Sequence, residues 1–163
     1  MPSLLIVYHS RTGGAAQMAQ ACFTGAQSEI AVHTRLLQAE QTVAADILAA
    51  QGLVFVCPEN LASMSGAMKE FFDRCYYDVI DQIAGRPYAT MICAGSDGQG
   101  TARQIARIAM GWRLKAIADP LIVHTHAQTP QAITAPKQLS ELQLQACTAV
   151  GQTFATGLAM GIF

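Results

Sequence analysis

Five runs of apolar residues alternate with longer stretches of helical periodicity, and this alternation constrains the fold more than any other feature. Repeated strand–helix units require a mostly parallel sheet with right-handed crossovers and helices on both faces. We therefore predict an α/β fold with a doubly wound, five-stranded parallel sheet of strand order 2-1-3-4-5. The predicted strands are Leu4 to Tyr8, Ile30 to Leu36, Leu53 to Cys57, Tyr88 to Ala94 and Ile117 to Val123. The predicted helices are residues 14–26, 43–50, 65–83, 100–113 and 137–157.

Size and charge restrict the classes of partner. A chain of 163 residues with 52% hydrophobic side chains can bury the core of one domain, which we expect to span residues 1–163. Only 13% of the residues are charged, with 10 basic against 11 acidic, so no strong field favours nucleic acid or an anionic membrane. Five scattered cysteines without metal-ligand spacing, and an N-terminus without a signal-peptide pattern, predict a cytoplasmic protein without a metal site or membrane span.

The loop after the first strand is the strongest functional signal. Residues 9–15, HSRTGGA, lead directly into a predicted helix. Unpaired N–H groups and the positive end of the helix dipole favour an anion at such a position. Ser10 and Thr12 add hydroxyl donors, while Gly13 and Gly14 allow close approach of a ligand to the backbone. The loop predicts a phosphate site, and an ordinary N-cap by Ser10 or Thr12 is the alternative.

Two further loops follow strands on the same predicted edge of the sheet. Residues 58–66, PENLASMSG, follow the third strand, and residues 95–101, GSDGQGT, follow the fourth. In open parallel sheets, ligands bind beyond the carboxyl ends of the strands where the strand order reverses. A phosphate at the first loop and a flat ring between the other two would make a nucleotide site. Helix initiation in the second loop and a plain turn in the third are the alternatives.

The three loops together resemble a known family. The segments LLIVYHSRTGGAAQMA, VFVCPENLASMSGAMKEFFDR and AGSDGQGTARQI are similar to the flavodoxin-like FMN proteins, especially the NAD(P)H-dependent FMN reductase and quinone reductase branch. The resemblance covers nearly the whole chain and implies non-covalently bound FMN. It also implies the contacts: Ser10, Arg11, Thr12, Gly13, Gly14 and Ala15 around the phosphate; Pro58, Glu59, Asn60, Leu61, Ala62 and Ser63 along the isoalloxazine; and Gly95, Ser96, Asp97 and Gly98 at its other edge.

Two loops depart from the family pattern. Gly14 and Ala15 stand where such loops often carry a longer polar residue and a hydroxyl, which removes side-chain donors to the phosphate. Asn60, Leu61 and Met64 occupy the region where many flavodoxins place a tyrosine or tryptophan against the flavin. The resemblance therefore predicts FMN binding without predicting the redox potential of the flavin.

The implied activity is that of an oxidoreductase. The resemblance implies that bound FMN takes a hydride from NAD(P)H and passes electrons to a quinone, a flavin or a similar small acceptor, without a catalytic acid–base pair. A flavodoxin-type single-electron carrier for protein partners is one alternative, although a net charge of −1 provides little long-range steering. A non-catalytic flavin-binding module is another. The resemblance also implies a homodimer or homotetramer, because relatives often complete the substrate pocket across a subunit contact.

Several polar side chains outside these loops are candidates for the substrate side. Arg103 and Arg107 lie one helical turn apart and suit a nicotinamide-nucleotide phosphate, although such pairs often form a solvated face. His124 and His126 would point to one side of an extended segment, with no third metal ligand nearby. The remaining candidates are His9, Tyr76 and Tyr77.

Overall fold

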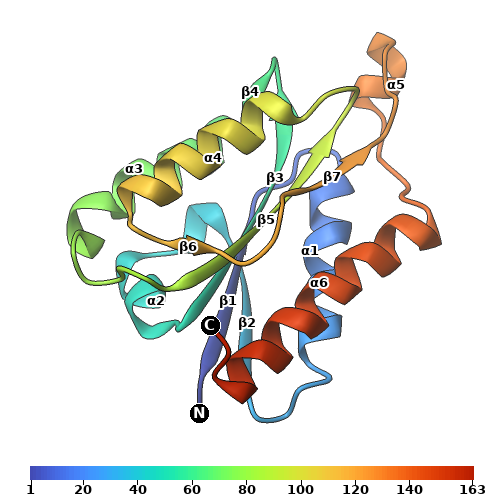
Figure 1. Ribbon diagram of the computed structural model, residues 1–163. Helices are drawn as coiled ribbons and strands as arrows, with labels where there is room; N and C mark the ends of the chain where they lie inside the picture. The colour runs from blue at the N-terminus through green and yellow to red at the C-terminus, as the bar shows by residue number, and fades with distance from the viewer.

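The computed structural model describes residues 1–163, with a central sheet covered by helices on both faces (Figure 1). The strands are β1 (Ser3–Tyr8), β2 (His33–Gln38), β3 (Gly52–Asn60), β4 (Ser63–Met64), β5 (Pro87–Ala94), β6 (Lys115–Ala116) and β7 (Leu121–His124). The helices are α1 (Gly14–Ala26), the short 3-10 helix η1 (Ala39–Gln41), α2 (Ala44–Ala49), α3 (Gly66–Val79), α4 (Gln99–Gly111), α5 (Pro130–Thr134) and α6 (Glu141–Met160).

The sheet has the strand order that the sequence predicts. It runs β2-β1-β3-β5, and β6 and β7 both pair with β5, with every one of these contacts parallel. Two short pieces thus occupy the fifth position of the sheet, and only β7 overlaps the predicted strand Ile117 to Val123. The predicted order 2-1-3-4-5 is confirmed. Pro120 lies in the gap between the pieces and has no N–H to donate to the neighbouring strand.

Alternating side chains of the buried strands fill two separate hydrophobic layers. Leu5 and Val7 of β1 join the layer under α3 and α4, where Phe55 and Phe72 pack edge to face at 4.9 Å. Leu4 and Ile6 point to the opposite face and join the layer under α1 and α6. Because both faces are covered, the buried parts of β1, β3 and β5 are nearly continuous in apolar residues, as the sequence pattern predicts.

The two helices on the second face approach each other at backbone distance. A Cβ on Gly25 of α1 would lie 2.0 Å from the carbonyl oxygen of Thr148, and one on Gly151 of α6 would lie 1.9 Å from that of Cys22. Neither glycine can therefore be enlarged without separating the helices. This contact fixes the position of α1, whose N-terminus follows the predicted phosphate loop.

Several element boundaries differ from the predictions. The second strand begins at His33 and not at Ile30, which is 89% exposed in the turn before it. The helix predicted over 65–83 ends at Val79, and the last helix begins at Glu141, after the capping residue Ser140, and not at 137. The hairpin strand β4 and the one-turn helix α5 were not predicted. No helix in the structure combines the length and the apolar character that crossing a membrane requires.

Candidate functional site

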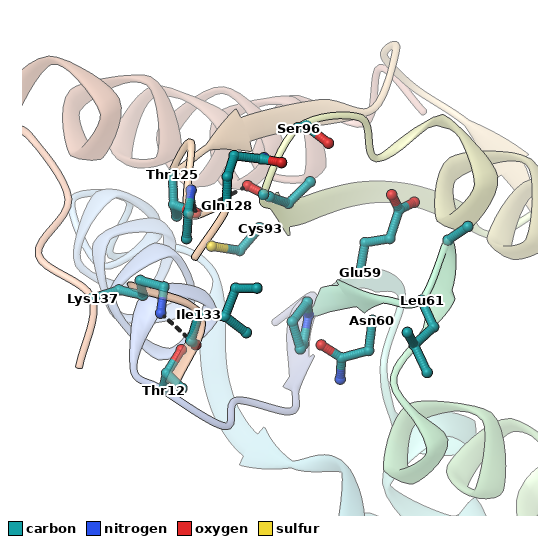
Figure 2. A pocket seen from close by; sticks show the side chains of 15 residues that line it. Thr12, Glu59, Asn60, Leu61, Cys93, Ser96, Thr125, Gln128, Ile133 and Lys137 are labelled. Carbon is teal, nitrogen blue, oxygen red and sulfur yellow. Dashed lines mark hydrogen bonds between the residues drawn. The ribbon is translucent and has the colours of Figure 1, made fainter. Parts of the chain in front are cut away.

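A cavity of about 360 Å³ opens at the carboxyl ends of β3 and β5 (Figure 2). Its walls come from four segments that are distant in sequence: the loop before α1, the β3–β4 hairpin, the loop after β5 and the segment after β7. The carboxyl edge of a parallel sheet is where such folds bind ligands. The cavity is therefore the candidate site.

The loop between β1 and α1 presents a group of unpaired backbone donors. Gly13 precedes the helix with φ +98°, and its N–H donates to Ser10 Oγ at 3.2 Å. The N–H groups of residues 10–12 and 14–16 have no acceptor within the chain. Gly14 and Ala15 are buried, and buried N–H groups in proteins almost always have a partner. Donors arranged in this way at a helix N-terminus fit a phosphate.

The two departures from the family pattern in this loop have a structural reason. A Cβ on Gly14 would lie 2.5 Å from Cys93 Sγ and 3.6 Å from the Cβ of Lys137. A side chain at this position would therefore collide with the end of β5. Ala15 is 2% exposed and belongs to the hydrophobic layer under α1. Backbone N–H groups are thus the main donors that this part of the loop offers.

The hairpin that joins β3 to β4 is strained at its tip. Leu61 and Ala62 form its two-residue turn with φ of +53° and +62°. Residues with a Cβ adopt this left-handed conformation at a cost of about 1–2 kcal/mol each, which explains why such turns usually contain Asn-Gly. Leu61 is fully exposed at the rim of the cavity. Strain of this kind persists only where neighbouring contacts hold the backbone in place.

Glu59 provides one of these contacts. Its Oε1 accepts the N–H of Gly98 at 2.8 Å, and its Oε2 accepts the N–H of Thr101 at 3.0 Å. The carboxylate thus caps the N-terminus of α4, where a negative charge is favourable. A side chain of the second loop therefore fixes the backbone of the third.

Gln104 and Gly100 complete the attachment of the hairpin to α4. Gln104 Oε1 accepts the N–H of Met64 at 2.8 Å, and its Nε2 donates to Ser63 Oγ at 2.8 Å. A Cβ on Gly100 would lie 2.2 Å from the carbonyl oxygen of Ala62. The hairpin and the first two turns of α4 consequently form one rigid wall of the cavity.

The loop after β5 divides into two parts. Gly95 and Ser96 line the cavity. Asp97 lies outside it, and its carbonyl oxygen is 2.7 Å from His124 Nε2. Gly98, with φ +94°, is the N-cap residue that precedes α4, and a Cβ there would lie 2.6 Å from the side chain of Ile122 of β7. Only the first half of this loop is therefore available to a ligand.

Comparison with known proteins identifies the family. Residues 8–128 match the family of NADPH-dependent FMN reductases. The chain belongs to this family. A flavodoxin from Aquifex aeolicus (strain VF5) is 27% identical over 169 residues, which cover 98% of this chain and 89% of the flavodoxin. The family match and this relative confirm the predicted resemblance and the prediction of an FMN-binding flavoprotein.

Solved structures show the same fold as this FMN reductase family member. A flavodoxin from the domain Archaea has a TM-score of 0.77 at 16% identity and covers 96% of this chain and 98% of its own. The flavodoxin, WrbA-like protein from Agrobacterium tumefaciens has a TM-score of 0.73 at 16% identity and covers 99% of both chains. This likeness confirms the predicted flavodoxin-like fold.

The structure brings half of the predicted site residues of this family member to the cavity. These are Thr12, Pro58, Glu59, Asn60, Leu61, Ala62, Gly95 and Ser96. Ser10, Arg11 and Gly13 instead line a second cavity of about 300 Å³ on the β2 side of the loop. Gly14 and Ala15 are buried at the start of α1, and Ser63, Asp97 and Gly98 lie against α4 or β7.

Seven lining residues were missed by the sequence analysis. They are Cys93, Ala94, Thr125, Ala127, Gln128, Ile133 and Lys137. The first two end β5, and the others belong to the segment after β7. Ligands bind at the carboxyl ends of parallel strands, and this rule also applies to β7, the edge strand next to β5. The rule therefore points to the segment after β7.

The other polar candidates of the sequence analysis lie outside the main cavity. His9 bridges Ser65 Oγ, at 2.8 Å from Nδ1, and Glu40 Oε1, at 3.5 Å from Nε2. Tyr76 and Tyr77 stack on the exposed face of α3 with ring centroids 5.5 Å apart. Arg103 and Arg107 are exposed on α4, and His126 follows β7. None of these side chains contributes to the lining of the main cavity.

Cys93 places a thiol on the floor of the cavity, with its sulfur visible between Ile133 and Gln128 in Figure 2. Burial raises the pKa of this thiol, and the positive charge of Lys137 opposes that effect. The thiol is therefore protonated at neutral pH and forms a neutral surface for a ligand.

Proposed function

We propose that this flavoprotein binds FMN in the main cavity and uses it as an NAD(P)H-dependent reductase of a quinone, a flavin or a similar small acceptor. The phosphate would lie at residues 10–15, and the isoalloxazine between the hairpin at 58–63 and the first half of the loop at 95–98, Gly95 and Ser96. The observation that carries the proposal is the group of unpaired N–H groups at 10–12 and 14–16 beside a cavity of about 360 Å³. Bound flavin supplies the hydride-accepting chemistry.

The ring end of the cavity also offers donors without partners. The N–H groups of Leu61, Gly95 and Ser96 have no acceptor within the chain, and all three residues line the cavity. A flat heterocycle with carbonyl and nitrogen acceptors fits such an edge. Pro58, Ile133 and the thiol of Cys93 add less polar surface, which suits a ring system.

The side chains of the cavity support orientation of a ligand rather than proton transfer. Glu59 is the one carboxylate in the lining, and both of its oxygens already accept N–H groups of α4. Hydride exchange through a flavin does not require a protein acid or base. The exposed Leu61 would shield one side of the ring from water.

A flavodoxin-type electron carrier is the second candidate, because a relative at 27% identity is a flavodoxin. The two candidates share the cofactor site and differ in electron donor and acceptor. A formal net charge of −1 gives little electrostatic steering toward a protein partner, and this supports the reductase. As part of the same proposal, residues 1–163 form one domain that assembles as a homodimer or homotetramer.

Two measurements test the proposal. Titration of the flavin-free protein with FMN should quench the flavin fluorescence and shift its absorbance, and protein that leaves both signals unchanged would refute cofactor binding. Oxidation of NADPH and NADH with a quinone acceptor should exceed the rate with free FMN alone. FMN binding without such turnover would favour the carrier, and light scattering during size-exclusion chromatography measures the assembly.

A further inference from the structure

The segment after β7 is bonded to the phosphate loop on both sides of Lys137. The N–H of Lys137 donates to the carbonyl oxygen of Thr12 at 2.8 Å. Gln17 of α1 donates from Nε2 to the carbonyl oxygens of Gly13 at 2.9 Å and Lys137 at 2.8 Å. Its Oε1 accepts the N–H of Leu139 at 3.1 Å. These bonds hold the backbone of Lys137 beside the N-terminus of α1.

The side chain of Lys137 is held in place but its charge is not paired. Its ammonium donates to the carbonyl oxygens of Ala132 at 2.8 Å, Ile133 at 2.9 Å and Ala135 at 2.7 Å. Carbonyl dipoles orient the ammonium without cancelling its unit charge. No carboxylate in the structure forms an ion pair with it. Lys137 therefore keeps a fixed positive charge at the wall of the cavity.

The two charged side chains of the cavity lie at opposite ends of it. Lys137 stands beside Thr12, whereas Glu59 lies at the hairpin end, against α4 (Figure 2). Arg11, the other cation near the loop, lines the second cavity and not this one. A ligand with an anionic tail and a neutral head matches this separation, with its tail at Lys137.

The field of Lys137 also reaches the floor of the cavity. Its charge lowers the pKa of Cys93, although burial keeps that pKa above its ordinary value. Gly14, the first residue of α1, would bring a Cβ to 3.6 Å from the Cβ of Lys137. The cation thus lies next to the position where Gly14 and Ala15 provide no side-chain donors.

We infer that Lys137, in the segment after β7, is the phosphate-binding cation of this protein. This inference rests on the proposed FMN site and goes beyond it by assigning the charge that recognises the phosphate dianion. The backbone N–H groups of the loop supply the directional hydrogen bonds, and Lys137 supplies the net charge. The fixed ammonium compensates for the missing side-chain donors at Gly14 and Ala15.

The test compares FMN with riboflavin, which carries the same ring and lacks the phosphate. Lys137→Met should raise the dissociation constant of FMN about ten-fold, because the positive charge beside the phosphate is lost, and leave that of riboflavin within about two-fold. Lys137→Arg keeps the charge and should stay within about three-fold of the wild type for FMN. Lys115→Met removes an exposed lysine of β6 and is the matched control.

Each alternative outcome has a distinct meaning. Equal losses of FMN and riboflavin affinity in Lys137→Met would show a purely structural role and overturn the inference, as would unchanged FMN affinity. Should Lys137→Met fail to fold, the wild type still decides, because its FMN affinity must fall with added salt more steeply than its riboflavin affinity. Wild-type protein that binds neither flavin would refute the proposed function itself.

Discussion

Replacement of Glu59 by glutamine tests whether one carboxylate connects the two loops at the ring end of the cavity. The substitution keeps the shape of the side chain and removes its charge and one of its two acceptors. One of the buried N–H groups, of Gly98 or Thr101, would then face an NH2 group. Glu59→Gln is therefore expected to destabilise the start of α4 without creating a cavity.

The expected loss follows from these two contacts. Leaving a buried N–H without an acceptor costs about 1–3 kcal/mol. Removing a negative charge from the N-terminus of a helix costs about 0.3–1 kcal/mol more. The free energy of unfolding should thus fall by about 1–4 kcal/mol, which for a chain of this size lowers Tm by about 3–15 °C.

Urea unfolding followed by tryptophan fluorescence measures this change. Trp112 is the single tryptophan and is buried at the end of α4, so its emission reports on the affected helix. Glu141→Gln is the matched control, because Glu141 lies in the first turn of α6 and accepts no hydrogen bond there. The free energy of unfolding of Glu141→Gln should lie within about 1 kcal/mol of the wild-type value.

The comparison of the two variants decides the outcome. If Glu59→Gln costs no more than Glu141→Gln, the hydrogen bonds to α4 do not hold the hairpin, and the account of the rigid wall fails. A large loss of unfolding free energy in Glu59→Gln but not in Glu141→Gln would support the role of Glu59 in joining the hairpin to α4.

Three further predictions concern single positions. Gly100→Ala should lower the free energy of unfolding by about 1–3 kcal/mol, because its Cβ meets a backbone oxygen of the hairpin at 2.2 Å. Gly111→Ala, which meets no atom within 4 Å, should be neutral or stabilising in the same urea titration. Burial of Asp46 acts to raise its pKa, but hydrogen bonds from the backbone N–H of Val43 and from Arg35 outweigh burial and lower that pKa. This contribution to stability is present above the ordinary aspartate pKa of about 3.9 and is lost as the pH falls through the lower folded-state pKa. Wild-type protein should therefore lose more stability than Asp46→Asn between pH 6 and about 2, and equal losses would contradict the pairing. Thr12→Asp should weaken FMN binding roughly a hundred-fold and leave riboflavin binding unchanged, since a second negative charge repels only the phosphate; equal effects in fluorescence titrations would disprove the placement.

The order of the elements was predictable because it depends on local patterns. Continuous apolar runs such as Leu53 to Cys57 require cover on both faces, and this requirement determines a parallel sheet. Ile30 was placed wrongly in a strand, because an apolar side chain at the end of a turn has the same local signature as the first residue of a strand.

The β3–β4 hairpin was not predictable from local sequence. Leu61 and Ala62 carry none of the Asn-Gly signal that marks such a turn. Contacts with Gln104, some forty residues further along the chain, hold it in place. Lys137 was missed for a similar reason, because its place in the cavity depends on a hydrogen bond to Thr12 from the opposite end of the chain.

The backbone contact between α1 and α6 has a consequence for biosynthesis. The loop ahead of α1 is translated before α6, the helix that packs against α1. Because Gly151 packs against Cys22, α1 gains this support only when α6 has left the ribosome. Loading of a nucleotide cofactor is therefore expected to follow the synthesis of α6, and a chain that stops at Ser140 should not retain the cofactor even though every loop around the flavin ring is already made.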